Sequence, residues 1–552
     1  MAATILTLCP RCCTILARKP GINAFLLTQL STDFKHNKQS PYIITTPIFY
    51  VNAAPHLGHL YTSLLADASC RWRSLKGQSV KLVTGTDEHG QKIEQAAHTH
   101  GQSPEDYCQK ISQKYQGLFT AFDIKHTDFI RTTDPAHIHA VQHFWERISG
   151  YLFKDKYQGW YCTSDEAFLT ESQIEESDNK MVVSKESGQI CEPIEEENYM
   201  FPLHLFADDI RRWHATNVIR PSGFLSSLDG ALENITDLSV SRSSQRLSWG
   251  IPVPNDPSQT IYVWLDALVN YLTACGYPRN LTNWPVSCHI VGKDILRFHA
   301  IYWPAFLMAA DLPLPRSILC HSHWLVDDRK MSKSIGNVVD PMQLRGRYTS
   351  DGLRYFLLRE GVAGQDGNYS ESKMLNYLNS ELCNTLGNLL NRCTSKSINK
   401  QQTYPPLDLD VHERVEEDGW KELMADLDLL PGLVSQHYEE YNFYKAVDCI
   451  MLQLRKSNGF MESQRPWELK DNPVLLDTVL HIVMENLRVC GILLQPIIPN
   501  LSCTLLDRLG IPKGARQVED LLPLSCHREA RMLQEGSPLY QRIKKDVHHT
   551  NT

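Results

Sequence analysis

The stretch "PYIITTPIFYVNAAPHLGHLYTSLLADA" (residues 41–68) decides the fold. Its first half is β-branched and aromatic, a pattern that predicts a buried strand over residues 41–52. From Leu60 onward, apolar residues recur at helical spacing until Gly77, so we expect an amphipathic helix there. A second strand, "SVKLVTG" (79–85), and the start of a second helix, "TDEHGQKIEQAA" (86–97), come next. Strand, helix and strand in this order predict a right-handed parallel crossover.

Two polar turns, "NAAPHLGH" (52–59) and "GTDEHG" (85–90), follow the ends of these strands. Ligands of parallel sheets bind beyond the carboxyl ends of the strands, so both turns should face one crevice. His56 and His59 stand at the start of the helix. They could be ordinary surface histidines or metal ligands, but zinc needs three or four ligands and no further His or Cys cluster lies nearby at an obvious spacing. The alternative is anion binding, because a helix N-terminus carries unpaired N–H groups and Gly58 lets a flat ligand approach.

The composition, with 42% hydrophobic and 21% charged residues, is that of a globular protein, and 552 residues are too many for one core. No apolar run reaches the ~20 residues of a membrane-spanning helix. The net charge of -8 excludes a global basic field, so contact with a polyanion needs local Lys and Arg patches. The 16 cysteines are scattered, which is typical of reduced thiols in an intracellular compartment.

Residues 1–38 differ from the rest of the chain. They carry Arg11, Arg18 and Lys19 and no acidic residue before Asp33. This composition is typical of a mitochondrial transit peptide; a secretory signal and a plain disordered start are the alternatives. A CxxC pair, Cys9 and Cys12, lies in this segment, and we expect it to be removed with the leader.

The remaining chain predicts an α/β protein followed by an α-helical bundle. Residues 39–156 form the first half of a Rossmann-like parallel-sheet domain, and the acidic, apolar-poor residues 157–258 indicate a small inserted domain with long loops. The sheet pattern returns over 259–325, with "TIYVWLDALVNYL" (260–272) and "SCHIVGKDILRFHAIYWPAFL" (287–307). Residues 326–373 contain the basic loop "DDRKMSKSIGN" (327–337), and residues 374–552 are helical apart from a polar linker.

The motif "KMSKS" (330–334) places two lysines three residues apart in a Ser-rich loop that could close over a polyphosphate. Alone, such a run is more often a solvated basic loop. The combination of "HLGH" after the first strand with "KMSKS" after the resumed sheet resembles the class I aminoacyl-tRNA synthetases. The motifs "PIFYVN", "GTDEHG", "WLDALVNY" and "GKDILRFH" resemble the methionine branch of that family, in its mitochondrial form, from about Tyr42 to about Glu468.

This resemblance implies a ligase that uses ATP and Mg²⁺ to form methionyl-adenylate and pyrophosphate and then charges the 3′-terminal adenosine of tRNA(Met). It implies that the ATP-binding residues are His56, Gly58, His59, Lys330, Lys333 and Ser334, with the two histidines and two lysines as catalytic groups. The residues that would bind methionine are Ile48, Tyr50, Asp87, Trp264, Ala267, Tyr271, Ile295 and His299, with Asp87 on the substrate ammonium. An apolar, aromatic lining suits a thioether, which carries no charge and accepts hydrogen bonds only weakly.

The resemblance also places Arg242 and Asp294 in the active site. In the helical region it implies that Asn388, Arg392 and Trp467 read the anticodon, with Asn388 and Arg392 on one helix face and Trp467 at the start of a helix. The absence of a further carboxyl-terminal module favours a monomer, and the leader implies the mitochondrial matrix.

One departure concerns the inserted domain, where many methionine-type enzymes carry CxxC pairs that bind zinc. Here Cys162 is followed by Asp165 and Cys191 by Ile194, so one thiol per half remains. We therefore predict no structural zinc. Two other functions stay open: a small-molecule nucleotidylyltransferase, since HxGH also occurs there, and a catalytically silent RNA-binding relative.

Overall fold

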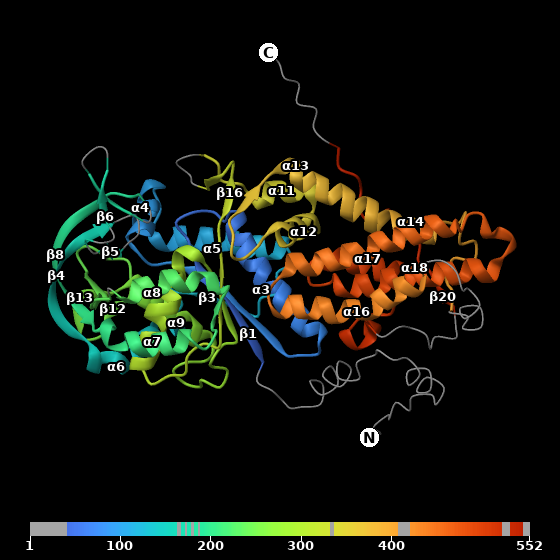
Figure 1. Ribbon diagram of the computed structural model, residues 1–552. Helices are drawn as coiled ribbons and strands as arrows, with labels where there is room; N and C mark the ends of the chain where they lie inside the picture. Colours follow the sequence, from blue (N-terminus) through green and yellow to red (C-terminus); the bar gives the residue numbers. More distant parts are fainter. Residues whose placement is uncertain are drawn as a thin grey trace, which may run out of the picture. The chain divides into compact units, whose positions relative to one another are not determined.

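A six-stranded parallel sheet organises the first half of the chain, in the order β3-β2-β1-β14-β15-β9. Figure 1 labels two of its strands, β1 and β3. The computed structural model describes residues 41–162, 167–169, 171, 174–177, 181–185, 188–233, 235–331, 336–406, 420–521 and 530–544. The predicted leader, with Cys9 and Cys12, lies outside the described residues, as do Asp165, Lys333 and Ser334. The strands of the sheet are β1 (Tyr42–Tyr50), β2 (Val80–Asp87), β3 (Asp128–Arg131), β9 (Ile219–Arg220), β14 (Cys288–Gly292) and β15 (Ile318–His321).

The predicted crossover is confirmed. Helix α3 (Leu57–Leu75) joins β1 to β2, which pair in parallel, and its buried face covers the sheet. Gly77, in the left-handed region at φ 74°, follows the end of α3. Gly85 in β2 has no room for a side chain, because a Cβ there would lie 1.9 Å from the carbonyl oxygen of Ile130 in β3. The helices that follow β2 and β3 are α4 (Gln91–Thr99), α5 (Pro104–Ala121) and α6 (Pro135–Ile148).

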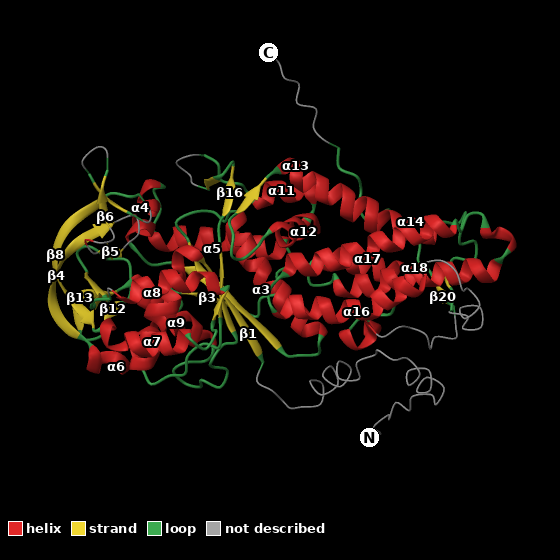
Figure 2. Cartoon of the chain, viewed as in Figure 1, coloured by secondary structure: helices red, strands yellow, loops and turns green. Residues whose placement is uncertain are grey.

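The acidic insertion is more regular than the sequence predicts. Strands β4 (Phe153–Cys162) and β8 (Cys191–Phe201) form a long antiparallel pair, and β5 (Ala167–Leu169) and β10 (Leu238–Ser239) complete a four-stranded sheet (Figure 2). A hairpin of β6 (Ile174–Glu176) and β7 (Val182–Ser184) adjoins it. Glu192, Glu195 and Glu197 are exposed on β8, so the acidic residues that suggested a loop belong to a strand that carries solvent-exposed side chains.

The main sheet resumes earlier than residue 259, the predicted boundary. Strand β9 pairs in parallel with β15, and α7 (Ala207–His214) and α8 (Leu225–Glu233) pack into the same core as the second half of the sheet domain. The expectation of a sheet pattern over 260–272 is wrong for most of that stretch. Only its start belongs to a strand, β13 (Asp256–Ile261), in an antiparallel sheet with β11 (Ser241–Ser243) and β12 (Pro252–Val253). The rest is helix α9 (Val263–Ala274), buried on nearly all sides, which hides its helical period.

Beyond β14 the chain forms a short turn at Lys293–Ile295, a π-helical segment at Phe298–Tyr302 and helix α10 (Trp303–Ala309). A small sheet of β16 (Trp324–Val326), β17 (Arg329–Lys330) and β18 (Gly367–Tyr369) then carries the basic loop. Helices α11 (Pro341–Tyr348) and α12 (Ser350–Glu360) lead to the helical region. None of the described helices has the length and apolarity needed to cross a bilayer.

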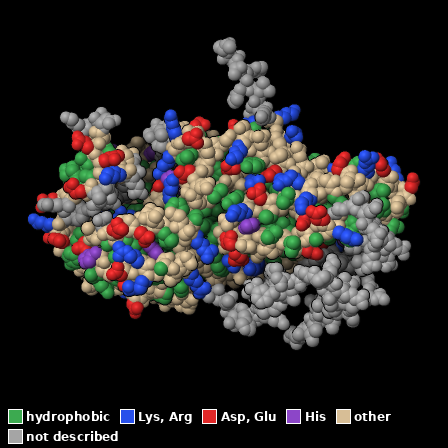
Figure 3. Space-filling view, viewed as in Figure 1, with side chains coloured by type: hydrophobic (Ala, Val, Ile, Leu, Met, Phe, Trp, Pro, Cys, Tyr) green, Lys and Arg blue, Asp and Glu red, His purple; other side chains and the backbone are tan. Residues whose placement is uncertain are grey.

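The expected helical bundle follows (Figure 2). Its helices are α13 (Glu371–Tyr377), a π-helical segment at Leu378–Gly387, α14 (Asn388–Thr394), α16 (Trp420–Glu439), α17 (Phe443–Gln464), α18 (Pro473–Leu493) and α19 (Pro499–Arg508). A strand pair, β19 (Thr403–Tyr404) and β20 (Arg531–Met532), lies at its far end. One apolar core runs from Ile44 in β1 through α3 into these helices, so α3 is shared by the sheet and the bundle. Acidic and basic side chains are interspersed over the face in Figure 3.

Candidate active site

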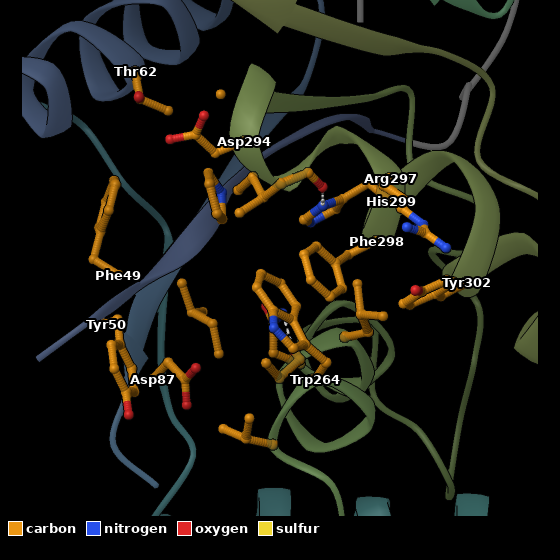
Figure 4. A pocket seen from close by; sticks show the side chains of 18 of the residues that line it. Phe49, Tyr50, Thr62, Asp87, Trp264, Asp294, Arg297, Phe298, His299 and Tyr302 are labelled. Carbon is orange, nitrogen blue, oxygen red and sulfur yellow. Dashed lines mark hydrogen bonds between the residues drawn. The ribbon is translucent and has the colours of Figure 1, made fainter. Parts of the chain in front are cut away.

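A pocket of about 550 Å³ opens at the carboxyl ends of β1, β2, β14 and β15 (Figure 4). The polar turns that the sequence places at these ends both contribute to it, as predicted. The residues expected in the active site that line this pocket are Ile48, Tyr50, His56, Gly58, His59, Asp87, Arg242, Trp264, Ala267, Tyr271, Asp294, Ile295, His299 and Lys330. Positions far apart in sequence therefore meet in one cavity.

The two histidines cap helix α3. His56 Nδ1 accepts a hydrogen bond from the backbone N–H of Gly58 at 3.0 Å, and His59 Nδ1 accepts one from the N–H of His56 at 3.1 Å. Burial, followed by the nearby His323 and Lys330, lowers the pKa of His56 to about 4. Burial also lowers the pKa of His59. Both rings are therefore neutral at pH 7 and carry their proton on Nε2, so each can donate one hydrogen bond to a ligand.

Gly58 has a local reason to lack a side chain. A Cβ at this position would lie 2.9 Å from Cε1 of His56, so a larger residue would displace the capping ring. The rings of His56 and His59 are stacked with their centroids 3.7 Å apart. Gly58 itself lines the pocket, and the approach of a flat ligand to its backbone stays a prediction.

Asp294 gathers two donors at the mouth of the pocket. Its Oδ2 atom lies 2.7 Å from Nζ of Lys330 and 2.9 Å from Nε2 of His323. Burial raises the pKa of Asp294, but the hydrogen bond from His323 and the charge of Lys330 outweigh it and hold that pKa well below its usual range. Asp294 is therefore ionised at neutral pH and keeps the first lysine of the "KMSKS" motif beside the pocket.

The opposite end of the pocket is aromatic. Trp264 is stacked on Phe298 with ring centroids 3.6 Å apart, and Figure 4 shows them across the cavity from Tyr50 and Asp87. Tyr271 is buried, and its Oη lies 2.7 Å from Nε2 of His299. This end can enclose an apolar side chain.

The direction of the bond between Tyr271 and His299 follows from the second ring nitrogen. His299 Nδ1 lies 2.9 Å from the carbonyl oxygen of Ile295, which can only accept, so Nδ1 carries the ring proton. Burial lowers the pKa of His299 to about 4, so the ring is neutral and Nε2 accepts. The hydroxyl of Tyr271 therefore donates to His299, which fixes its orientation.

A buried carboxylate positions the "GTDEHG" turn. Asp266 in α9 lies 2.7 Å from Nδ1 of His89 and 2.8 Å from Nε2 of His137. Burial raises the pKa of Asp266, but the contacts with His89 and His137 lower it more. Trp249 donates from Nε1 to the carbonyl oxygen of Glu88 at 2.6 Å. These contacts hold the turn that presents Asp87 to the pocket.

The side chain of Arg242 is also buried. Its guanidinium donates to the carbonyl oxygens of Ser239 and Ser241 and lies 4.2 Å from the centroid of the Tyr262 ring. The side chain thus borders the pocket from the inserted region and stabilises the chain where it returns to the sheet domain.

The family model described as "tRNA synthetases class I (M)" matches residues 42–394. The chain belongs to this family. The mitochondrial methionine--tRNA ligase of Xenopus laevis is 48% identical over 491 residues, which is 87% of this chain and 87% of the relative. That of Homo sapiens is 49% identical, over 86% of this chain and 85% of the relative. The Mycobacterium tuberculosis methionyl-tRNA synthetase in complex with methionyl-adenylate matches with a TM-score of 0.85 and 35% identity, over 91% of this chain and 100% of that one.

The three residues expected to read the anticodon lie in the helical region of this class I synthetase chain. Asn388 and Arg392 lie on α14 as predicted, and Asn388 is exposed. The guanidinium of Arg392 lies 5.3 Å from the ring centroid of Trp467 and pairs with Glu462 at 2.8 Å. The expectation that Trp467 begins a helix is wrong: this residue lies in a turn after α17, because Arg465 adopts a left-handed conformation ahead of Pro466.

The two cysteines of the insertion are register partners. Cys162 on β4 faces Cys191 on β8, and both are buried. Within the described ranges, no group of three or more His, Cys, Asp or Glu side chains is arranged to hold a metal ion. Whether the family's zinc is missing here stays a prediction, because Asp165 lies outside these ranges.

Several pocket residues were not expected from the sequence. They are Thr62, Lys92, Arg297, Phe298, Tyr302 and His323. Phe298 and Tyr302 lie four residues apart on the π-helical segment and share the face that lines the pocket with His299. The repeated histidine in "HSHW" (321–324), directly after a buried strand, is the signal that could have found His323.

Proposed function

We propose that the chain activates methionine with ATP, forming methionyl-adenylate and pyrophosphate, and then charges the 3′-terminal adenosine of tRNA(Met) in mitochondria. The observation that carries the proposal is the division of one pocket into two ends. Hydrogen-bond donors suited to phosphates lie at the start of α3 and at Lys330, and an apolar aromatic wall lies opposite. These are the two recognition surfaces that a nucleotide and a thioether amino acid require.

The first step needs no covalent protein nucleophile. The carboxylate of methionine attacks the α-phosphorus of ATP, the bond to the bridging oxygen breaks, and pyrophosphate leaves with the developing negative charge. His56 and His59 would each donate from Nε2 to phosphate oxygens, and Lys330 would neutralise charge; Lys333 and Ser334 belong to this group by their place in the motif. Asp294 is already paired with Lys330 and His323, so Mg²⁺ would be held largely by phosphates and water.

The amino acid would bind against the aromatic wall. The carboxylate of Asp87 would pair with the substrate ammonium, and the side chain would lie among Ile48, Trp264 and Tyr271. The full set of proposed methionine contacts is Ile48, Tyr50, Asp87, Trp264, Ala267, Tyr271, Ile295 and His299, with Arg242 bordering the site. Sulfur–aromatic contacts would favour methionine over aliphatic side chains that lack sulfur.

The tRNA would extend from this pocket to the helical bundle. Sequence-specific RNA recognition uses unstacked bases that stack on aromatic rings and bond along their edges. The proximity of Arg392 to Trp467, with Asn388 exposed on the same helix as Arg392, supports a base-reading cluster. We further propose that the enzyme acts as a monomer in the mitochondrial matrix and without a structural zinc ion.

An ATP–pyrophosphate exchange assay with each of the twenty amino acids tests the proposal. Exchange is expected with methionine alone, and Lys333→Ala should nearly abolish it while leaving tRNA binding unchanged. A nucleotidylyltransferase for another small molecule would show no exchange with any amino acid. A silent RNA-binding relative would bind tRNA but show neither exchange nor charging.

A further inference from the structure

A third imidazole lies at the phosphate end of the pocket. His323 stands between β15 and β16, directly beyond the carboxyl end of β15, which lies next to the edge strand β9, and lines the cavity with His56 and Lys330. Its side chain is 21% exposed. The neighbouring His321 is different, because it is buried against α3, where its Nε2 lies 2.8 Å from Oγ1 of Thr62.

The backbone at His323 is fixed from two sides. Its N–H donates to Oδ1 of Asp366 at 2.8 Å, and its carbonyl oxygen accepts from the N–H of Gly367 at 2.8 Å. Asp366 in turn accepts from Nζ of Lys293 at 2.7 Å. The main chain therefore has little freedom here, and the ring projects into the pocket from a defined position.

The ring of His323 shares one acceptor atom with a lysine of the "KMSKS" motif. Nε2 of His323 and Nζ of Lys330 both lie within hydrogen-bond distance of Oδ2 of Asp294, at 2.9 and 2.7 Å. A carboxylate oxygen only accepts, so Nε2 of His323 carries a proton directed at an anionic oxygen. Two donors that converge on one anionic oxygen form an arrangement that also fits a phosphate oxygen.

We propose that His323 is a further phosphate-binding residue, whose Nε2–H passes together with Lys330 from Asp294 to the triphosphate of ATP. This rests on the proposed function, because it assigns a role within the same activation step. As the bond between the α-phosphorus and the bridging oxygen breaks, negative charge grows on the leaving pyrophosphate. A donor already aimed at this region stabilises that charge without reorganisation.

The test uses the full-length enzyme and two variants of this one position. His323→Leu removes the donor, whereas His323→Gln keeps an amide N–H close to the place of Nε2. We expect His323→Leu to lower kcat/KM for ATP by about tenfold or more, and to raise the KM for pyrophosphate in the reverse reaction, while the KM for methionine stays unchanged. His323→Gln should recover most of the loss. His143→Gln, which alters an exposed histidine outside the pocket, is the matched control and should behave as the wild type.

Two results would overturn the inference. One is a wild-type KM for pyrophosphate and a wild-type exchange rate in His323→Leu. The other is equal damage in both variants, with a raised KM for methionine and a lower melting temperature, which would mark a purely structural histidine. A wild-type enzyme without methionine-dependent exchange would instead refute the proposed function, so the two failures can be told apart.

Discussion

Arg354 on α12 and Asp67 on α3 form an ion pair at 2.7 Å in which neither side chain is exposed. The same guanidinium donates to the carbonyl oxygens of Ile497 and Pro496, in the connection between α18 and α19. Asp67 also accepts from the backbone N–H of Lys125 at 2.9 Å. The helix that carries His56 and His59 at its N-terminus is thus fixed at its middle to the helical bundle.

This geometry predicts a large stability loss in Arg354→Leu. The substitution leaves the buried carboxylate of Asp67 with Arg71, at 2.6 Å, as its remaining ion-pair partner among the described residues. It also removes the donor from the backbone carbonyls of Ile497 and Pro496. We expect the free energy of unfolding to fall by about 3–5 kcal/mol, measured by urea denaturation. Arg212→Ala, which breaks an exposed pair with Asp209, should cost less than about 1 kcal/mol. Equal losses in the two variants would contradict the role of the buried pair.

Tyr271→Phe tests the proposed methionine-binding end of the pocket. The phenol hydroxyl donates to His299, so its removal leaves a buried lone pair on Nε2 without a donor and loosens the wall beside the substrate. We expect kcat/KM for methionine to fall by about tenfold, while the KM for ATP stays close to the wild-type value. Tyr151→Phe, at an exposed position outside the pocket, serves as the control. An unchanged KM for methionine would mean that the hydroxyl does not shape the site.

The crossover of β1, α3 and β2 could be predicted because each element carries its own signal. The strands are β-branched and the helix repeats with its own period, and the carboxyl-end rule then places both polar turns at one crevice. This rule explains why His56, His59 and Asp87 meet at one pocket, although they lie at or beyond the ends of different strands. The motif residues and the pocket aromatics Tyr50, Trp264 and Tyr271 were expected from the resemblance to the class I synthetases, because spacing alone assigns a role to none of them.

Other features depend on contacts that no local pattern records. Helix α9 is apolar on nearly every side, so its period disappears and the segment looks like a strand. The two-residue strand β9 is defined by its pairing with β15 and carries too few residues for a periodic signal. The role proposed for His323 depends on its contact with Asp294, which follows the neighbouring strand β14 and is distant in sequence.

Acidification should weaken the fold through buried histidines such as His321. Burial lowers the pKa of His321 from its ordinary value to about 4, so below pH 6.5 the unfolded chain binds a proton that the folded chain does not. Its contribution to stability is present above pH 6.5 and is lost as the pH falls toward 4. Between pH 7 and 5.5 we expect a loss of roughly 1 kcal/mol from this group, which His321→Gln should not show. Urea denaturation of both proteins at the two pH values measures the difference, and parallel losses would exclude His321 as a cause.

Trp467→Ala should separate the two catalytic steps. The ring lies beside the guanidinium of Arg392 in the helical bundle, on elements that do not line the pocket. If a base of the anticodon stacks on this ring, its loss removes about 1–3 kcal/mol of binding, which lowers kcat/KM for tRNA roughly 5- to 150-fold. Methionine-dependent exchange should keep its wild-type rate, and Trp467→Phe, which retains an aromatic face, should restore much of the charging. A parallel fall of exchange and charging in Trp467→Ala would trace the defect to folding and remove the ground for a base-reading role.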